Sequence, residues 1–153
     1  ALEKYHKGKY YIQRLRSRED IEKAHKLFKE ACDLDFHFIE ALAEYGLTFQ
    51  KLGEYDEAEE YLEKALKQAE NEKYDVGIAS TYNLMGILYY IWGKTKLSSN
   101  CYERALEFQN KLNDKFKESK ILGNVSENYI LQGNIDKALG CLEQSRDIKI
   151  DLE

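Results

Sequence analysis

Side chains that could carry catalysis or bind a metal are few in this sequence and stand far apart. The three histidines and three cysteines are His6, His25, His37, Cys32, Cys101 and Cys141. His6 and His37 have no cysteine or carboxylate at the spacing of metal ligands, and the sequence holds no CxxC pair, HExxH motif or GxxxxGK[ST] loop. No serine stands at a spacing from a histidine that supports a nucleophile and its base. We therefore expect a protein that is not an enzyme and that has no catalytic residue, metal or cofactor.

The surroundings of these residues predict structural roles. His25 stands among charged residues of a helical segment, so we expect it to be exposed. Each cysteine lies within a helical pattern, where a free thiol packs as a small apolar group. An odd number of widely spaced cysteines fits a reducing compartment, and we expect the protein to be cytoplasmic.

The composition predicts a folded domain that binds neither nucleic acid nor membrane. Apolar residues make up 43% and charged residues 33% of the 153 residues, which is a globular composition. The net charge of −5 argues against a nucleic-acid partner, which favours a basic protein face. No apolar run reaches the ~18 residues of a membrane span. Because the chain begins at Ala1 rather than at methionine, we expect it to be a fragment of a longer protein.

The strongest signal is an internal repeat with a period of 40 residues. Gly53, Gly93 and Gly133 recur at this spacing between two helical patterns, where glycine can adopt the left-handed conformation that ends a helix. The other positions that repeat are Phe49, Tyr89 and Tyr129; Leu62, Tyr102 and Leu142; Ala58, Ser98 and Ala138; Ala65, Ala105 and Ser145; Gly46, Gly86 and Ser126. Small residues let two helices approach closely, and large residues fill the space beside them. Each unit is thus predicted to be a helix, a turn and a second helix that must stack on its neighbours.

The periodicity of apolar residues predicts an all-α fold. The expected helices are 4–15, 19–34, 38–51, 55–71, 75–92, 95–112, 115–131 and 135–149. Tyr82, Tyr89, Tyr102 and Tyr129 are expected to pack in the core between them.

This pattern resembles the tetratricopeptide repeat (TPR) family, whose units carry a small residue and an aromatic in the first helix, then Gly, then Ala, an aromatic and Ala. One copy of the pattern is Gly46, Phe49, Gly53, Ala58, Leu62 and Ala65. Two more copies follow it at the spacing of 40 residues. An N-terminal copy keeps Ala24, Phe28 and Ala31 but has Ile12 where the small residue is expected. The resemblance implies a right-handed α-solenoid of four helix pairs in a single domain, with repeats at about 5–38, 39–74, 75–114 and 115–153.

In the resembled family, the first helices line a concave groove that holds an extended peptide or a partner helix. The residues carried over to this groove are Tyr10, Leu47, Asn83, Leu84, Ile87, Tyr90, Ile91, Asn124, Glu127, Ile130 and Leu131. The resemblance therefore implies a scaffold that binds a protein or peptide through an exposed apolar patch. Asn83, Asn124 and Asn128 are candidates to hydrogen-bond a ligand backbone. The alternative is that a further C-terminal helix covers the apolar positions.

Chaperone-binding members of the family hold a C-terminal carboxylate with a clamp of Lys, Asn and Arg. Lys9 fits the first clamp position. The other positions are occupied by Gln13, Glu44, Ser80 and Leu84. Because Glu44 would repel a carboxylate, we do not expect binding to the tails of Hsp70 or Hsp90.

The N-terminal run is similar to TPR segments attached to class III nucleotide cyclases and related bacterial signalling regulators. The residues that match are Tyr5, Gly8, Tyr10, Tyr11, Ala24, Phe28 and Ala31. This similarity implies the alternative that the chain is a sensor region within a larger signalling protein. Self-association as a homo-oligomer is another alternative, because the last predicted helix carries the apolar residues Leu139, Leu142, Ile148 and Ile150.

Overall fold

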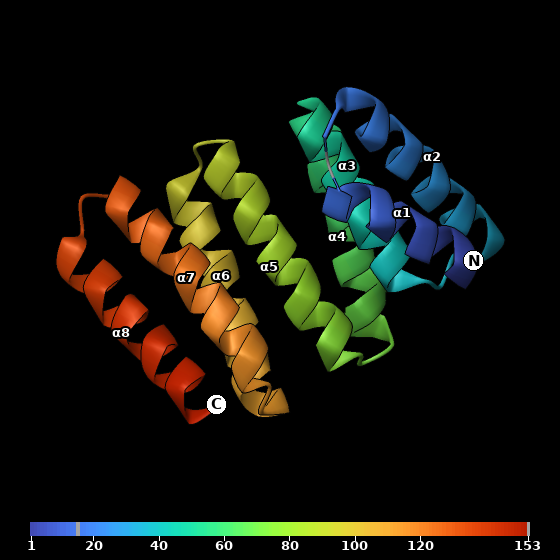
Figure 1. The fold of residues 1–153 in the computed structure, drawn as a ribbon. Helices are drawn as coiled ribbons and strands as arrows, with labels where there is room; N and C mark the ends of the chain where they lie inside the picture. Colours follow the sequence, from blue (N-terminus) through green and yellow to red (C-terminus); the bar gives the residue numbers. More distant parts are fainter. Residues whose placement is uncertain (15, 153) are drawn as a thin grey trace. The chain divides into compact units, whose positions relative to one another are not determined.

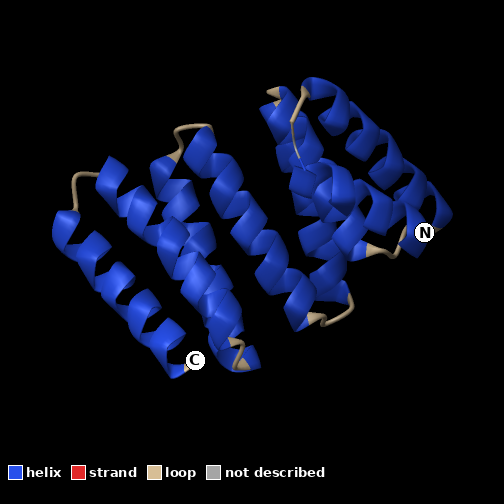
Figure 2. Ribbon diagram, in the orientation of Figure 1, coloured by secondary structure: helices blue, strands red, loops and turns tan. Residues whose placement is uncertain are grey.

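The computed structural model describes residues 1–14 and 16–152 of the chain. In these residues it forms eight α-helices and no strand, which confirms the all-α class (Figures 1 and 2). The helices are α1 (Leu2–Arg14), α2 (Arg18–Leu34), α3 (Ile39–Leu52), α4 (Tyr55–Asn71), α5 (Asp75–Ile91), α6 (Thr95–Leu112), α7 (Lys115–Leu131) and α8 (Ile135–Asp151). The predicted helix ends agree to within two residues, except that the end expected at Leu15 lies outside the described residues. So does Glu153, the expected end of the last repeat.

The three glycines that end the first helices adopt the conformation predicted for them. Gly53, Gly93 and Gly133 have φ angles of 88°, 78° and 72°. The backbone N–H that follows each glycine donates to the carbonyl of the repeated aromatic residue, for example from Glu54 to Phe49 at 2.9 Å. These bonds satisfy carbonyl groups that a helix end otherwise leaves unpaired. The repeated pair of glycine and aromatic residue therefore closes each first helix.

The links from α4 to α5 and from α6 to α7 turn without glycine. Lys73 and Asn113 take positive φ angles of 53° and 55° there. Asn113 tolerates the left-handed conformation better than most residues, because its short polar side chain can hydrogen-bond to nearby backbone groups. The side chain of Asp114 then caps α7 by accepting from the backbone N–H of Lys117 at 3.1 Å.

Two of the first helices carry a glycine that lies directly beneath an aromatic ring of the second helix. A Cβ atom at Gly86 would lie 2.5 Å from Cε1 of Tyr102. A Cβ atom at Gly8 would lie 2.6 Å from Cε1 of Phe28. The expectation that Ile12 replaces the small residue of the first repeat is therefore wrong, because Gly8 fills that role. Gly8 precedes Phe28 by 20 residues rather than the 16 between Gly86 and Tyr102, and this difference hid the match.

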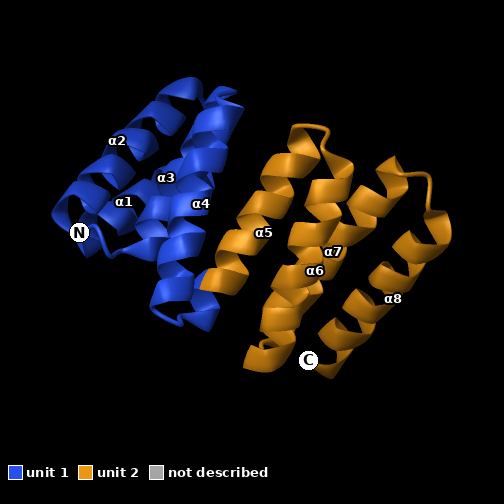
Figure 3. Ribbon diagram, turned by 180° about the vertical axis from the view of Figure 1, so that it is seen from behind, with its two compact units in different colours: residues 1–77 blue, residues 78–153 orange. Residues whose placement is uncertain are grey.

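The described residues form two compact units, 1–77 and 78–153, which Figure 3 shows in different colours. In unit 1, α1 packs on α2, α2 on α3, and α3 on α4. Its core is aromatic: Phe28 and Tyr45 are buried, and the rings of Phe49 and Tyr61 stack at 5.2 Å between centroids. The single-domain organisation stays a prediction.

The core of unit 2 centres on Tyr102, which is 2% exposed. Ile121 and Val125 of α7 pack over it, and Tyr82 and Tyr129 are partly buried against the same cluster. Ser98 stands where the neighbouring repeats have alanine, and its hydroxyl donates to the carbonyl of Gly86 at 2.8 Å. The buried hydroxyl is therefore satisfied, so serine substitutes for alanine at this close helix contact.

Candidate partner-binding surface

Nine of the eleven residues predicted for the groove lie in unit 2, on α5 and α7. The two helices run in the same direction (Figure 1). They are bridged where the side chain of Asn124 donates to that of Asn83, with 3.3 Å between Nδ2 and Oδ1. At a rise of about 1.5 Å per residue, Ile91 and Leu131 lie roughly 11 Å further along the two helices. The bridge therefore sets two stripes of predicted groove residues beside each other.

The exposed part of this surface is aliphatic. Ile91, Ile130 and Leu131 are 45%, 51% and 59% exposed, so each leaves a large apolar area in water. Leu84 and Tyr90 are half-buried, and Glu127 is exposed. We define Ile91, Ile130 and Leu131, together with the Asn83–Asn124 bridge, as the α5/α7 face.

Two residues predicted to bind a partner instead make contacts inside the protein, which leaves less of their side chains available for a ligand. Ile87 packs against the cluster around Tyr102 and is only partly exposed. Asn128 is 1% exposed, and its amide donates to Ser99 Oγ at 2.7 Å and to the carbonyl of Thr95 at 3.2 Å. The suggestion that Asn128 bonds a ligand backbone is therefore wrong, because its side chain points into the protein and joins α7 to α6.

Residues 38–111, which span α3 to α6, match the family model described as tetratricopeptide repeat. These residues contain tetratricopeptide repeats. A comparison with curated proteins finds no match. TPR units generally serve as modules that bind other proteins rather than as catalysts, which agrees with the coarse functional class expected from the sequence.

Solved structures confirm the fold as an all-α solenoid. The chain is 24% identical to a Signal Transduction ATPase with Numerous Domains protein with a tetratricopeptide repeat sensor from Pyrococcus horikoshii, with a TM-score of 0.87 over 97% of this chain and 23% of that chain. It is 22% identical to BtubC (BKLC) from P. vanneervenii, with a TM-score of 0.78 over 86% of this chain and 57% of that chain. TPR-like repeats from Podospora anserina match at 14% identity and a TM-score of 0.76, over 97% of this chain and 74% of that chain. At these identities the likeness shows the fold alone, and the similarity to nucleotide cyclase segments stays a prediction.

In unit 1, two of the positions that were compared with the chaperone clamp contact each other. Lys9 of α1 forms an ion pair with Glu44 of α3, whose side chain is 11% exposed. Tyr10 is half-exposed and accepts a hydrogen bond from Arg14, and Leu47 is half-buried on α3. Lys9, the one residue that fits the carboxylate clamp, is thus neutralised by Glu44. The expectation that chaperone tails do not bind stays a prediction.

His25 lies against the aromatic core of unit 1. Its ring centroid is 4.6 Å from that of Tyr45 and 4.7 Å from that of Phe49, and its Nδ1 is 2.8 Å from Oγ1 of Thr48. Burial lowers the pKa of His25 below its usual value, with Lys29 contributing and Glu54 opposing. The expectation that His25 is exposed is therefore wrong, because α3 covers its ring. The charged residues beside His25 on α2 had suggested that the ring faces solvent.

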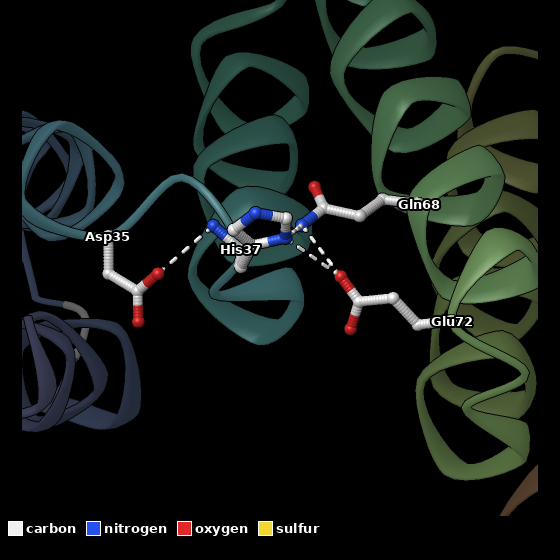
Figure 4. Close-up of polar contacts among 4 residues, drawn as sticks. All are labelled: Asp35, His37, Gln68 and Glu72. Carbon is white, nitrogen blue, oxygen red and sulfur yellow. Dashed lines mark hydrogen bonds and ion pairs between the residues drawn. The ribbon is translucent and has the colours of Figure 1, made fainter.

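His37 lies in a polar cluster that fastens the α2–α3 link to the end of α4 (Figure 4). Its Nδ1 is 3.0 Å from Oε1 of Glu72 and 3.2 Å from Nε2 of Gln68, and its backbone N–H donates to Asp35. The hydrogen bond from His37, followed by that from Gln68, lowers the pKa of Glu72. Among the described residues, no three His, Cys, Asp or Glu side chains are grouped to hold a metal. The contacts of His37 with Glu72 and Gln68 link the α2–α3 segment to the last turn of α4.

Some exposed apolar residues were missed from the sequence. Ile135 at the start of α8 is 53% exposed and stands four residues before Leu139, which is 52% exposed. This spacing places both on one side of the helix and could have revealed the stripe. Phe36, in the α2–α3 link, is 75% exposed and gave no periodic signal. None of the described helices is long and apolar enough to span a bilayer.

Proposed function

We propose that this chain is a protein-interaction module and that the α5/α7 face receives an apolar peptide or helix of its partner. The observation that carries this proposal is that exposed aliphatic residues stand near the C-terminal ends of both α5 (Ile91) and α7 (Ile130 and Leu131), two helices that the Asn83–Asn124 bridge joins. Exposed apolar residues gathered on one face commonly mark an interaction site, because covering them removes apolar area from water.

The chemistry of the face favours an apolar ligand with a polar backbone. Ile91, Ile130 and Leu131 offer aliphatic contacts. The bridging amides of Asn83 and Asn124 keep donor and acceptor groups that an extended peptide backbone could use. Such a face takes part in recognition without any reacting group.

A sensor region within a larger signalling protein is the second candidate. The Pyrococcus horikoshii structure is described as having a tetratricopeptide repeat sensor, and this chain corresponds to 23% of that protein. Both candidates need a surface that binds a ligand, because a sensor also has to bind what it senses.

The test is selection of peptides from a random display library on the immobilised chain, followed by affinity measurement with each selected peptide. Ile91→Glu combined with Ile130→Glu should weaken binding at least ~10-fold, since a buried contact residue of this kind is worth about 1.4 kcal/mol or more. These two positions suit the test better than Ile87, whose contact with the Tyr102 cluster would confuse binding with folding.

Phe36→Glu is the matched control, because it places the same charge at an exposed apolar residue of unit 1. Thermal melting of all three proteins shows whether they remain folded. Selected peptides that bind the Ile91/Ile130 variant as tightly as the unchanged protein would contradict the proposal.

A further inference from the structure

One charged side chain stands within the α5/α7 face. On α5 no residue from 76 to 91 is charged, and on α7 Glu127 is the only charged residue from 121 to 131. Glu127 follows Asn124 by three positions and precedes Leu131 by four, so it lies on the side of α7 that carries the face. It is exposed, and among the described residues no cation pairs with its carboxylate. The face therefore combines aliphatic residues with one unpaired negative charge.

The repeat shows that packing does not require this carboxylate. The residues that match Glu127 in the two preceding repeats are Leu47 and Ile87. Leu47 is half-buried on α3, and Ile87 packs against the cluster around Tyr102. An aliphatic side chain thus suits this position in two repeats, whereas the exposed glutamate of the third is free to bind a ligand.

Space for a side chain of that ligand lies one turn before Glu127. Gly123 is four positions before Glu127, on the same side of α7. A Cβ atom at Gly123 would meet nothing within 4 Å. The residue of α5 that matches Gly123 is Asn83, whose side chain is held by Asn124. A long side chain can therefore lie over the backbone at Gly123 with its end at Glu127.

Tyr90 of α5 adds an aromatic ring near this carboxylate. Burial is the main reason why the pKa of Tyr102 is raised, and Glu127 and Tyr90 add to the rise. The side chains of Glu127 and Tyr90 thus lie near the same hydroxyl group. Carboxylates and aromatic rings both attract cations. Their combination here favours a ligand with a basic side chain.

We propose that the segment bound at the α5/α7 face carries an arginine or lysine, whose stem lies over Gly123 and whose cation pairs with Glu127. Along α7, Glu127 and Leu131 are about 6 Å apart, since each residue rises about 1.5 Å. This distance spans roughly two residues of an extended peptide, and residues two apart point to the same side. The segment therefore has its basic residue two positions from an aliphatic one. This inference rests on the proposed function and names the chemistry of the partner.

The first test is parallel selection of peptides from one random display library on the unchanged chain and on Glu127→Lys. The unchanged chain should enrich arginine or lysine two positions from an aliphatic residue, and Glu127→Lys should enrich aspartate or glutamate there. Glu127→Gln should weaken a peptide selected on the unchanged chain by roughly 3- to 5-fold, as is typical of an exposed ion pair. Salt at about 0.5 M should reduce this difference, because it screens the charges. Glu143→Gln is the matched control, since it removes an exposed carboxylate of α8, outside the face.

Gly123→Lys tests the space over Gly123. The new side chain can reach Glu127 one turn away, so it occupies the place proposed for the basic residue of the partner. Affinity for the selected basic peptide should fall at least ~3-fold, because an exposed ion pair is worth about that much. Gly123→Ala leaves the space open and should bind the peptide as the unchanged chain does. Thermal melting of both variants checks that they fold, as expected where a Cβ atom meets no neighbour.

The outcomes separate this inference from the proposed function. Selected peptides that depend on Ile91 and Ile130 but contain no basic residue, or that bind Glu127→Gln as tightly as the unchanged chain, would overturn the inference and leave the proposed function standing. Peptides that ignore Ile91→Glu combined with Ile130→Glu, or a library that yields no binder, would contradict both. A dimer of the unchanged chain that this double substitution dissociates would make a second copy the occupant and overturn the inference.

Discussion

Each unit joins one helix pair to the next through a polar contact, and the two contacts differ in chemistry. In unit 1, His25 of α2 meets Thr48 of α3, with 2.8 Å between Nδ1 and Oγ1. In unit 2, Asn128 of α7 donates to Ser99 of α6 at 2.7 Å. These are matching places, since His25 and Ser99 each follow the small residue of their helix and Thr48 and Asn128 are separated by two repeats of 40. The repeat thus fixes where a polar contact joins the pairs, but it does not fix which side chains make that contact. We call this contact the joint of each unit.

The surroundings differ as well. The His25 ring is half-buried between Tyr45 and Phe49. Asn128 is 1% exposed and satisfies the carbonyl of Thr95 in addition to Ser99. A fully buried amide with two partners should cost more to remove than a half-buried imidazole. Only the joint of unit 1 can titrate near neutral pH.

The largest effect should come from a feature that the two units share, the glycine beneath an aromatic ring. Gly86→Ala places a Cβ atom 2.5 Å from the ring of Tyr102, and Gly8→Ala places one 2.6 Å from that of Phe28. Both rings are buried and cannot move freely. We expect each variant to lower the free energy of unfolding by about 2 kcal/mol, measured by urea denaturation.

Gly123→Ala is the matched control for these two variants. Gly123 also lies in a first helix, but a Cβ atom there meets nothing within 4 Å. Alanine should raise stability by up to ~1 kcal/mol, because it favours the helix more than glycine does. If Gly86→Ala lowered the free energy of unfolding and Gly8→Ala did not, the two units would not share this close contact between a glycine and an aromatic ring.

A smaller effect should come from the joint of unit 2. Asn128→Ala removes both hydrogen bonds of the amide, one to the Thr95 carbonyl and one to the Ser99 hydroxyl. We expect a loss of about 1.5 kcal/mol in the free energy of unfolding. Gln132→Ala is the control, because Gln132 donates to the same Ser99 hydroxyl at 3.0 Å from an exposed position. Equal losses in the two variants would show that burial of Asn128 does not set its cost.

Local patterns predicted much of the fold. The positive φ angles of Gly53, Gly93 and Gly133 followed from a residue type placed between two helical patterns. The helix ends followed from the same turns. The role of Gly8 was not predicted, because Gly8 precedes Phe28 by one helical turn more than Gly86 precedes Tyr102. Applying the spacing of the other repeats to Phe28 pointed to Ile12 instead.

Contacts between repeats were harder to predict. The sequence around His25 is charged, and only the position of α3 shows that Tyr45 and Phe49 cover the ring. Asn128 and Asn124 are four residues apart on α7, yet one is buried and the other lies half-buried on the α5/α7 face. The spacing of residues in the sequence predicts which of them share one side of a helix. The position of the neighbouring helix decides which side is covered. The binding role of the α5/α7 face stays a prediction.

The smallest effect should be a dependence on pH that belongs to the joint of unit 1. Because burial lowers the pKa of His25 in the folded protein, the unfolded chain takes up a proton first as the pH falls. The contribution of His25 to the free energy of unfolding is therefore fully present above the unfolded pKa of about 6.5 and is lost as the pH falls toward the lower folded value. Urea denaturation at neutral and mildly acidic pH should show a steeper loss for the unchanged protein than for His25→Gln, while Asn128→Ala keeps the full slope. If His25→Gln lost stability over this range as steeply as the unchanged protein, the pH dependence would lie elsewhere and the two joints would be equivalent.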